Sequence, residues 1–264
     1  MNDGHSSHPE FVRYYVEASL TEKARQRAAS ILAAVMRERA SRGASVERLA
    51  VADIGCNAGT QSRVWLEAGH LVEGLDISSD LVEVASRRNS EFAGRARFQV
   101  GNATRLPWSD AKFDVCLMPE LLEHVLDLEA ALREAVRVLK LGGTLFLTTT
   151  NWLCPVQQEF NLPGYSWYPG WLKKIFLKKA LSTSPQLANY ATHPAYHWFS
   201  YYQLRRYLVR LSITARDRFD VADMTNRPPV VVAALRLIRA LPPLRLAAHV
   251  LTEGTIVVGE KRPQ

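Results

Sequence analysis

Short apolar runs alternate with segments of helical periodicity from residue 20 to residue 150. The apolar runs predict strands at residues 49–54, 71–75, 96–100, 113–118 and 144–149. The helical periodicity predicts helices at residues 20–40, 60–68, 79–88 and 128–139. Alternation of this kind is typical of a parallel sheet covered by helices on both faces.

The alternation stops after residue 150 and resumes near residue 200. Residues 151–197 contain many aromatic side chains and no clear strand, and loops of this length in a compact domain are usually functional. Beyond them, the pattern predicts a helix at 201–211, a strand at 212–220, an apolar helix pair around 230–250 and a last strand at 255–260. We therefore expect four parts: a helical cap at 1–48, a core at 49–150, a lid insertion at 151–198 and a remainder of the sheet at 199–264.

Composition narrows the class of protein. With 264 residues and 47% hydrophobic content, the chain can bury the core of one large domain. No apolar run is long enough to span a membrane, and the first twenty residues do not resemble a signal peptide. Three cysteines without metal-ligand spacing (Cys56, Cys116, Cys154) indicate reduced thiols, so we expect a cytoplasmic protein. The net charge of +7 would suit an anionic partner, but no nucleic-acid-binding motif accompanies it.

One glycine loop suggests a nucleoside cofactor. The segment Val51-Ala52-Asp53-Ile54-Gly55-Cys56-Asn57-Ala58-Gly59 joins a predicted strand to a predicted helix, and the next strand stops at Asp76. Glycines let a backbone approach a ligand closely, and an acidic strand end can accept hydrogen bonds from ribose hydroxyls. The spacing G-x-x-x-G differs from the dinucleotide pattern, and Asp53 would repel a phosphate but suit a cationic ligand.

Further motifs follow in order: Gly101-Asn102-Ala103, Glu120-Leu121-Leu122-Glu123-His124-Val125 and Val138-Leu139-Lys140-Leu141-Gly142-Gly143. Together with the glycine loop and Asp76, they resemble the class I S-adenosylmethionine-dependent methyltransferases, and among these the group of ubiquinone-biosynthesis O-methyltransferases. The resemblance covers residues 50–150. It implies an α/β fold with a Rossmann-like, doubly wound, seven-stranded sheet whose last strand is antiparallel, and S-adenosyl-L-methionine as cofactor.

The resemblance also implies roles for single residues. Asp53 would face the amino acid end of the cofactor through water, Asp76 would hold the ribose, and Ile77 would pack on the adenine. Asn102 and Ala103 would recognise the adenine edge, while Pro119 and Glu120 would line the methionine part. The expected loop residues are Gly55, Cys56, Asn57 and Gly59. Asn57 stands where the family usually has glycine, and asparagine tolerates the left-handed conformation better than most residues.

The methyl acceptor is less defined. A hydroxyl acceptor benefits from a general base, for which His124, His193 and His197 are the candidates and Glu120 a further one. Each histidine could equally be a packing or surface residue. No residue fixes the nucleophile, so N- or C-methylation and a catalytically silent S-adenosylmethionine-binding regulator remain alternatives to O-methylation. No metal-ligand cluster is visible, and a nucleic-acid acceptor is disfavoured.

Two segments combine apolar and basic residues. Residues 165–179 contain clustered tryptophan and tyrosine beside lysines, and residues 235–246 mix leucine with arginine. Residues 165–179 predict either a lid whose aromatic side chains form the acceptor pocket, which we favour, or a surface that contacts an anionic membrane. Both fit a small, lipophilic or lipid-linked acceptor and a peripheral position at the inner membrane surface.

Overall fold

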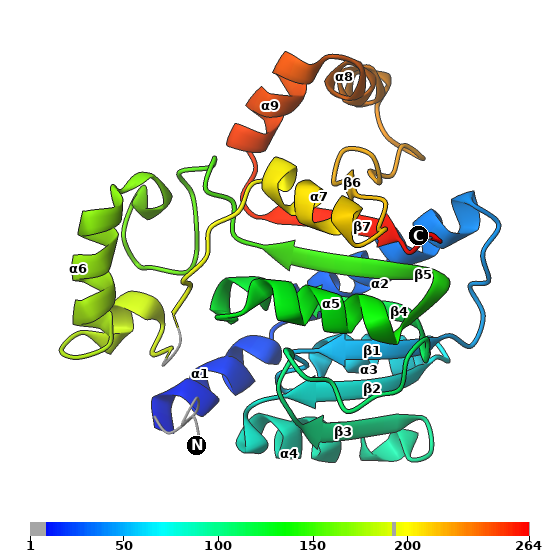
Figure 1. Ribbon diagram of the computed structural model, residues 1–264, viewed down its shortest axis with the longest axis horizontal. Helices are drawn as coiled ribbons and strands as arrows, with labels where there is room; N and C mark the ends of the chain where they lie inside the picture. Colours follow the sequence, from blue (N-terminus) through cyan, green and yellow to red (C-terminus); the bar gives the residue numbers. More distant parts are fainter. Residues whose placement is uncertain (1–8, 192–193, 264) are drawn as a thin grey trace.

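A computed structural model describes residues 9–191 and 194–263, and its centre is a seven-stranded sheet (Figure 1). The strands are β1 (Ala50–Ile54), β2 (Leu71–Asp76), β3 (Ala96–Val100), β4 (Phe113–Pro119), β5 (Leu139–Thr149), β6 (Arg216–Asp217) and β7 (Thr255–Glu260). Their order in the sheet is β3-β2-β1-β4-β5-β7-β6. Strands β1 to β5 are parallel, whereas β7 is antiparallel to both β5 and β6. The predicted α/β sheet with an antiparallel last strand is confirmed.

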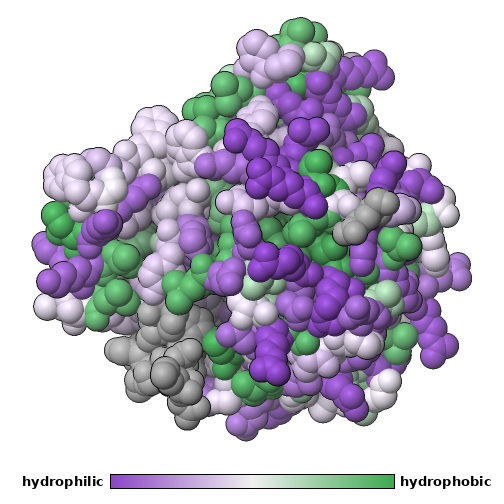
Figure 2. All heavy atoms as spheres, in the orientation of Figure 1, coloured by the Kyte–Doolittle hydropathy of each residue, from purple (hydrophilic) through white to green (hydrophobic). Residues whose placement is uncertain are grey.

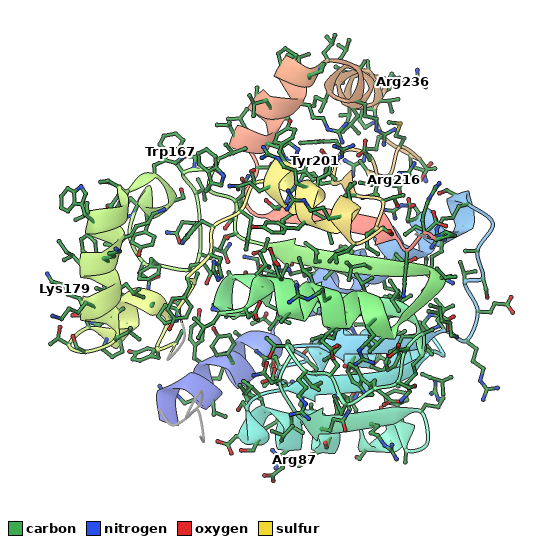
Figure 3. All side chains as sticks on the ribbon, in the orientation of Figure 1. Arg87, Trp167, Lys179, Tyr201, Arg216 and Arg236 are labelled. Carbon is green, nitrogen blue, oxygen red and sulfur yellow. The ribbon has the colours of Figure 1, made fainter. Side chains whose placement is uncertain are left out.

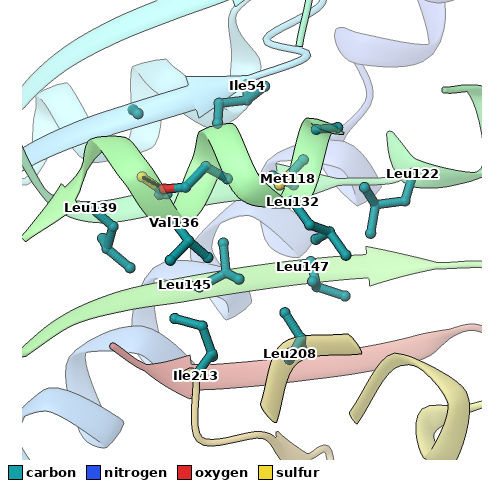
Figure 4. Close-up of a cluster of buried hydrophobic side chains, with 14 of the residues drawn as sticks. Ile54, Met118, Leu122, Leu132, Val136, Leu139, Leu145, Leu147, Leu208 and Ile213 are labelled. Atoms are coloured by element: carbon teal, nitrogen blue, oxygen red, sulfur yellow. Dashed lines mark hydrogen bonds between the residues drawn. The ribbon is translucent and has the colours of Figure 1, made fainter. Parts of the chain in front are cut away.

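Helices cover both faces of the sheet, as a doubly wound fold requires. The helices α2 (Glu22–Ser41) and α3 (Thr60–Glu67) pack on one face through a cluster that includes Val35 and Trp65. The helices α5 (Leu128–Val138) and α7 (Tyr201–Arg210) pack on the other. Figure 4 shows this second cluster, in which Leu132 and Leu208 lie on either side of Leu147 from β5. The helix α4 (Ser79–Arg88) contacts β3 and β2 at the edge of the sheet.

The strand order determines where a ligand can bind. Between β1 and β4 the direction of winding reverses, so the loops that follow these two strands diverge to opposite faces. In open α/β sheets, ligands bind at this point, outside the carboxyl ends of the strands. In Figure 1 these ends point toward the side that holds α1 (Pro9–Ser19) and residues 151–198.

The structure differs from the sequence predictions in three elements. Helix α1 lies where no separate helix was expected, and β5 begins at Leu139, five residues before the predicted strand. The strand expected at 212–220 contains only Arg216 and Asp217. It ends there because the Asp217 carboxylate accepts the backbone N–H groups of Phe219 and Asp220, which turns the chain away from the sheet.

Two appendages extend from the sheet. The first contains the helix α6 (Gly170–Ala180) and two short 3₁₀ turns, Tyr165–Trp167 and Pro185–Ala188. These elements surround a small hydrophobic cluster that includes Phe160 and Tyr165. The helices α8 (Pro229–Ala240) and α9 (Pro242–Val250) form the second appendage. The described residues include no helix that is long and apolar enough to cross a membrane. The division of the chain into four parts stays a prediction.

Candidate cofactor and acceptor site

The loop after β1 adopts the backbone conformation that its residues suggested. Gly55 and Gly59 both have φ of +79°, and Asn57 has φ of +49°. The prediction that asparagine can replace glycine in this loop is therefore confirmed. A Cβ on Gly59 would meet the Asn89 amide nitrogen at 2.7 Å, and one on Gly55 would meet the Leu121 side chain at 3.0 Å, so both glycines also serve packing within the protein. That they let the backbone approach a ligand stays a prediction.

Asp76 joins the glycine loop to the end of β2. Its Oδ2 accepts the backbone N–H of Asn57 at 2.9 Å, and its Oδ1 accepts that of Ser78 at 3.0 Å. Burial raises the pKa of Asp76, and the hydrogen bonds from Ser78 and Asn57 partly counteract this effect. An ionised carboxylate offers about four acceptor positions, so this one can still accept hydrogen bonds from two hydroxyl groups.

Asp53 lies behind the glycine loop rather than at its surface. Its side chain is 0% exposed, its Oδ2 accepts the Ser62 hydroxyl at 2.6 Å, and its Oδ1 has no hydrogen-bond partner. Burial raises the pKa of Asp53 to about 6, although the hydrogen bond from Ser62 lowers it. Direct contact between Asp53 and a ligand is thus not possible in this conformation, and its expected role through water stays a prediction.

A cavity of about 720 Å³ lies in front of the loop and brings most of the predicted cofactor residues together. Its volume is in the range of small-molecule sites. The predicted residues that line it are Gly55, Cys56, Asn57, Asp76, Ile77, Asn102, Ala103, Pro119, Glu120 and His124. Asp53 and Gly59 are the two predicted cofactor residues that do not line it. Tyr14 and Tyr15 of α1 form part of its wall, and no sequence motif indicated them.

Asn102 is oriented differently from the expectation. Its side-chain oxygen already accepts the backbone N–H of Thr104 at 2.9 Å and the Thr104 hydroxyl at 2.8 Å. A carbonyl oxygen has two lone pairs, so this atom has none left for the amine of an adenine. Asn102 and Ala103 both line the cavity, and their recognition of the adenine edge stays a prediction.

A second cavity of about 700 Å³ adjoins the first. The ends of β5 and β7 form its floor, through Thr149 and Thr255 among others, and Arg218 lies in its wall. Arg27, Glu120 and Glu159 line both cavities and mark their junction. The first cavity thus lies at the switch point of the sheet, and the second lies beside it at the ends of β5 and β7.

Acidic side chains cluster at this junction. The Glu120 backbone has φ of +50°, and its carboxylate forms a two-point ion pair with Arg27 of α2. Burial raises the pKa of Glu159 to about 7, and repulsion from Glu120 adds to this effect. Burial also raises the pKa of Glu123, whose two oxygens have no hydrogen-bond partner at normal geometry.

Among the described residues, one group has the chemistry of metal ligands. Glu123, His124 and Glu159 each place one ligand atom within 4.8 Å of the other two. A divalent cation could bind there, and a proton shared between the two carboxyl groups would also reduce their repulsion. That no metal participates stays a prediction, but the sequence alone did not reveal this group because Glu159 lies far along the chain.

The three candidate histidines have different positions. His124 lines the first cavity, with its Nε2 at 3.7 Å from Glu159. His197 lines neither cavity, and its buried Nε2 has no hydrogen-bond partner. The hypothesis that His197 touches the acceptor is not supported in this conformation, because its backbone carbonyl is held by the Thr150 hydroxyl beside the sheet end. His193 lies outside the described residues.

The aromatic side chains of residues 165–179 do not line either of these two cavities. Tyr165 stacks on Phe160 with ring centroids 4.0 Å apart, inside the appendage itself. Trp167 and Trp171 are 59% and 65% exposed. That these side chains form an acceptor pocket therefore stays a prediction. Polar residues that precede them, such as Glu159, line the cavities instead.

Comparison with known sequences matches the central part of the chain to methyltransferases. A family model described as a methyltransferase domain matches residues 52–147. Over 97 residues the chain is 33% identical to the malonyl-[acyl-carrier protein] O-methyltransferase of Serratia marcescens, covering 37% of this chain and 36% of that protein. Over 102 residues it is 35% identical to a ubiquinone biosynthesis O-methyltransferase of Xanthomonas campestris pv. campestris, covering 38% and 43%. The match thus spans less than half the length of these curated relatives.

Comparison with solved structures extends the likeness of fold over more of the chain. The structure of a geranyl diphosphate methyltransferase in complex with S-adenosylmethionine has a TM-score of 0.58 at 16% identity and covers 98% of this chain and 93% of its own. An S-adenosylmethionine-dependent methyltransferase from Methanosarcina mazei has a TM-score of 0.52 at 20% identity and covers 83% and 95%. Residues 52–147 thus match the methyltransferase domain family, and the chain is similar in fold to solved S-adenosylmethionine-dependent methyltransferases.

Proposed function

We propose that the protein is an S-adenosylmethionine-dependent methyltransferase that methylates an oxygen of a small, lipophilic or lipid-linked acceptor. The junction of the two cavities at Glu120 and Glu159 carries this proposal. A cofactor in the first cavity and an acceptor in the second would meet there, and alignment of two reactants can supply several kcal/mol of a barrier.

The residues of the first cavity fit the cofactor. Asp76 keeps acceptor positions for ribose hydroxyls, and Ile77 offers an apolar surface, 37% exposed, beside it. The acidic junction suits the positive charge of the cofactor's sulfonium and amino groups. When bound, S-adenosylmethionine supplies an electrophilic methyl group. The protein's part is then to orient the acceptor, exclude water and take up the hydroxyl proton.

The raised pKa of Glu159, about 7, suits a group that takes up a proton near neutral pH. Two sequence-predicted bases lie near it: His124, whose Nε2 is 3.7 Å from Glu159, and Glu120, which is paired with Arg27. A hydroxyl acceptor fits these groups, because its proton has to leave as the bond to the methyl carbon forms. N- and C-methylation on the same scaffold are the alternatives that an acceptor assay separates.

A lipophilic acceptor is supported by the two appendages. Residues 160–216 contain eight lysines and arginines but no aspartate or glutamate. Figure 3 places Trp167 and Lys179 at the outer edge of the appendage that holds α6, and Arg236 on α8. Figure 2 shows hydrophobic and hydrophilic residues side by side over α6 and over α8 and α9. Exposed tryptophans beside lysines fit the interface of an anionic membrane, so we propose peripheral contact there.

The test of the proposed function is transfer of a labelled methyl group from S-adenosylmethionine to matched octyl compounds. Octylcatechol offers hydroxyl groups and octylaniline an amine, while octylbenzene has neither. The proposal expects label in octylcatechol only, with inhibition by S-adenosylhomocysteine. Label in octylaniline alone would instead support N-methylation. Tight cofactor binding without transfer to any hydroxyl compound would support a silent regulator.

A further inference from the structure

The second cavity has charged side chains of both signs in its lining. Its end beside the cofactor cavity carries the acidic group Glu120, Glu123 and Glu159, whereas Arg218 lies at its other end, directly after β6. Strands β4, β5, β7 and β6 are successive neighbours in the sheet. Because adjacent strands are about 4.8 Å apart, the two ends are separated by roughly 10 to 15 Å. This length matches a small organic acceptor with a functional group at each end.

Arg218 is a cation without a carboxylate partner at hydrogen-bond distance among the described residues. Its Nη2 donates to the backbone carbonyls of Glu253 at 2.9 Å and Gly254 at 2.8 Å, and its buried Nε has no partner. Burial lowers the pKa of Arg218, and attraction from Asp217 offsets this only in part. The Asp217 carboxylate is already occupied by Arg245 and His249, at 2.8 and 2.9 Å.

Two hydroxyl groups lie between the two ends, Thr149 nearer the acidic group and Thr255 nearer Arg218. Thr149 of β5 and Thr255 of β7 are directly paired across the two strands, and Thr255 follows Gly254, whose carbonyl Arg218 holds. Both side chains are nearly fully buried, and neither hydroxyl oxygen has a hydrogen-bond partner at normal geometry. The Thr149 hydroxyl lies close enough to Glu123 to counteract in part the raised pKa of that carboxyl.

Buried polar groups are normally paired, and an unpaired one costs about 1–3 kcal/mol. The guanidinium of Arg218 and the Thr255 hydroxyl are both hydrogen-bond donors, both residues line the second cavity, and Arg218 holds the carbonyl of Gly254, which precedes Thr255. Charge-assisted hydrogen bonds from arginine to a carboxylate or phosphate are among the stronger ones in proteins. The ligand group that pairs with both is therefore an oxyanion.

We propose that the methyl acceptor carries an oxyanion, a carboxylate or a phosphate, that binds to Arg218 and Thr255 at the end of the second cavity away from the cofactor. The identification of this ligand as the acceptor rests on the proposed function. The oxyanion orients the acceptor along the cavity, so that its other end lies at the junction beside Glu159. Neutral molecules of the same length lack this anchor.

The experiment is calorimetric titration with octanoate, octyl phosphate and octanol at fixed ionic strength, with and without saturating S-adenosylhomocysteine. We expect at least one of the two acids to bind at least tenfold more tightly than octanol, and the tighter acid identifies the source of the oxyanion. Arg218→Gln should bind that acid no better than octanol. Arg218→Lys, which keeps the charge, should retain part of the preference.

Two further variants separate the anchor from effects on folding. Arg210→Gln removes an exposed arginine of α7 that lies outside both cavities, and it should bind like the wild type. Thr255→Val keeps the shape of a buried side chain and should weaken binding of the acid several-fold. Equal binding of octanol and both acids to the wild type, no binding of any octyl compound, or equal behaviour of Arg218→Gln and Arg210→Gln would overturn the inference.

The titration also distinguishes the inference from the proposed function. If S-adenosylhomocysteine does not bind but the acid binds through Arg218, the oxyanion site stands and the methyltransferase function fails. If S-adenosylhomocysteine binds and the octyl compounds are not distinguished, the inference fails and the function stands.

Discussion

The carboxylate of Asp76 accepts the backbone N–H of Asn57 at 2.9 Å, which fixes the end of β2 to the loop that follows β1. Asn57 can present this N–H because its backbone has φ of +49°. The second oxygen of Asp76 is held by the N–H of Ser78, so both carboxylate oxygens have defined positions before any ligand binds. Such preorganisation reduces the entropy cost of binding, and Asp76 is therefore the residue on which we expect cofactor affinity to depend most.

Gly59 should be intolerant of a side chain. Gly59→Ala would put an alanine in the left-handed backbone conformation, at φ +79°, and its Cβ would meet Asn89 and the backbone of Ala85. We therefore expect the free energy of unfolding to fall by roughly 3 kcal/mol. Gly43→Ala has a similar φ of +70° with nothing within 4 Å, so it should cost only about 1 kcal/mol. Urea unfolding measures both, and equal losses in the two variants would contradict the packing role of Gly59.

Asp53 should make stability depend on pH. Burial raises its folded pKa from 3.8 to about 6, so the folded protein holds this proton more tightly than the unfolded chain. The contribution of the protonated Asp53 carboxyl to the free energy of unfolding is therefore complete below pH 4. It is lost as the pH rises toward 6, and the loss is at most roughly 3 kcal/mol. Asp53→Asn removes the titration and keeps an acceptor for Ser62.

The measurement for Asp53 is urea unfolding of the wild type and Asp53→Asn between pH 4 and pH 8. The stability of the variant relative to the wild type should rise from pH 4 to pH 6 and then stay constant. A difference that is independent of pH, or that falls over this interval, would show that the Asp53 carboxyl is not raised by burial.

Helix α9 should depend on the buried Asp217. Burial alone would raise the pKa of this carboxyl, but hydrogen bonds from His249 and Arg245 outweigh it and lower the pKa to about 2. A carboxyl with a lowered pKa contributes stability above pH 4 that is lost as the pH falls toward 2. Arg245→Met leaves this charge only partly paired and should cost roughly 3 kcal/mol at pH 7, measured by urea unfolding.

Arg210→Met is the control for Arg245→Met, because Arg210 is an exposed arginine on α7 and its removal should change stability by less than about 0.5 kcal/mol. If the two variants unfolded at the same urea concentration, the ion cluster around Asp217 would not hold α9.

Contact with a membrane should depend on the exposed tryptophans. The double variant Trp167→Ser and Trp171→Ser should bind at least tenfold more weakly to vesicles with 30% anionic lipid, since the lysines of α6 would lose their apolar anchor. Each lysine near an anionic surface contributes about 1 kcal/mol, so wild-type binding should also fall with salt. Co-sedimentation measures this, with Leu20→Ser, an equally exposed residue away from α6, as control.

Equal sedimentation of the double variant and the wild type would exclude α6 as the membrane contact. Binding to neutral vesicles as tight as to anionic ones would exclude the electrostatic part of the proposal.

The sheet could be predicted from sequence because its determinants are local. The run from Leu71 to Leu75 and its acidic end at Asp76 form β2 as expected, and the alternation up to residue 150 gave the helices between strands. Helix α1 was not predicted, since Val12 and Tyr15 pack against Ala58 and Leu81, and these contacts exist only in the folded chain. The short β6 was overestimated because its end depends on the hydrogen bonds of the Asp217 side chain.

The candidate site also contains residues that local motifs predict and residues that only the tertiary structure reveals. Gly55, Asp76 and Glu120 belong to contiguous motifs, and the fold places them around one cavity. Arg27, Glu159 and Arg218 were missed because they come from three distant segments and have no local signature. Their roles follow from burial and from missing partners, which only the tertiary structure reveals.

The most direct test of the account is calorimetric titration of S-adenosylmethionine and S-adenosylhomocysteine into the wild type, Asp76→Ala and the control Asp110→Ala, an exposed aspartate outside both cavities. We predict micromolar binding of both ligands to the wild type and the control, and at least a hundredfold loss in Asp76→Ala. No binding to the wild type, or the same affinity in all three proteins, would contradict the assignment of the first cavity to this cofactor.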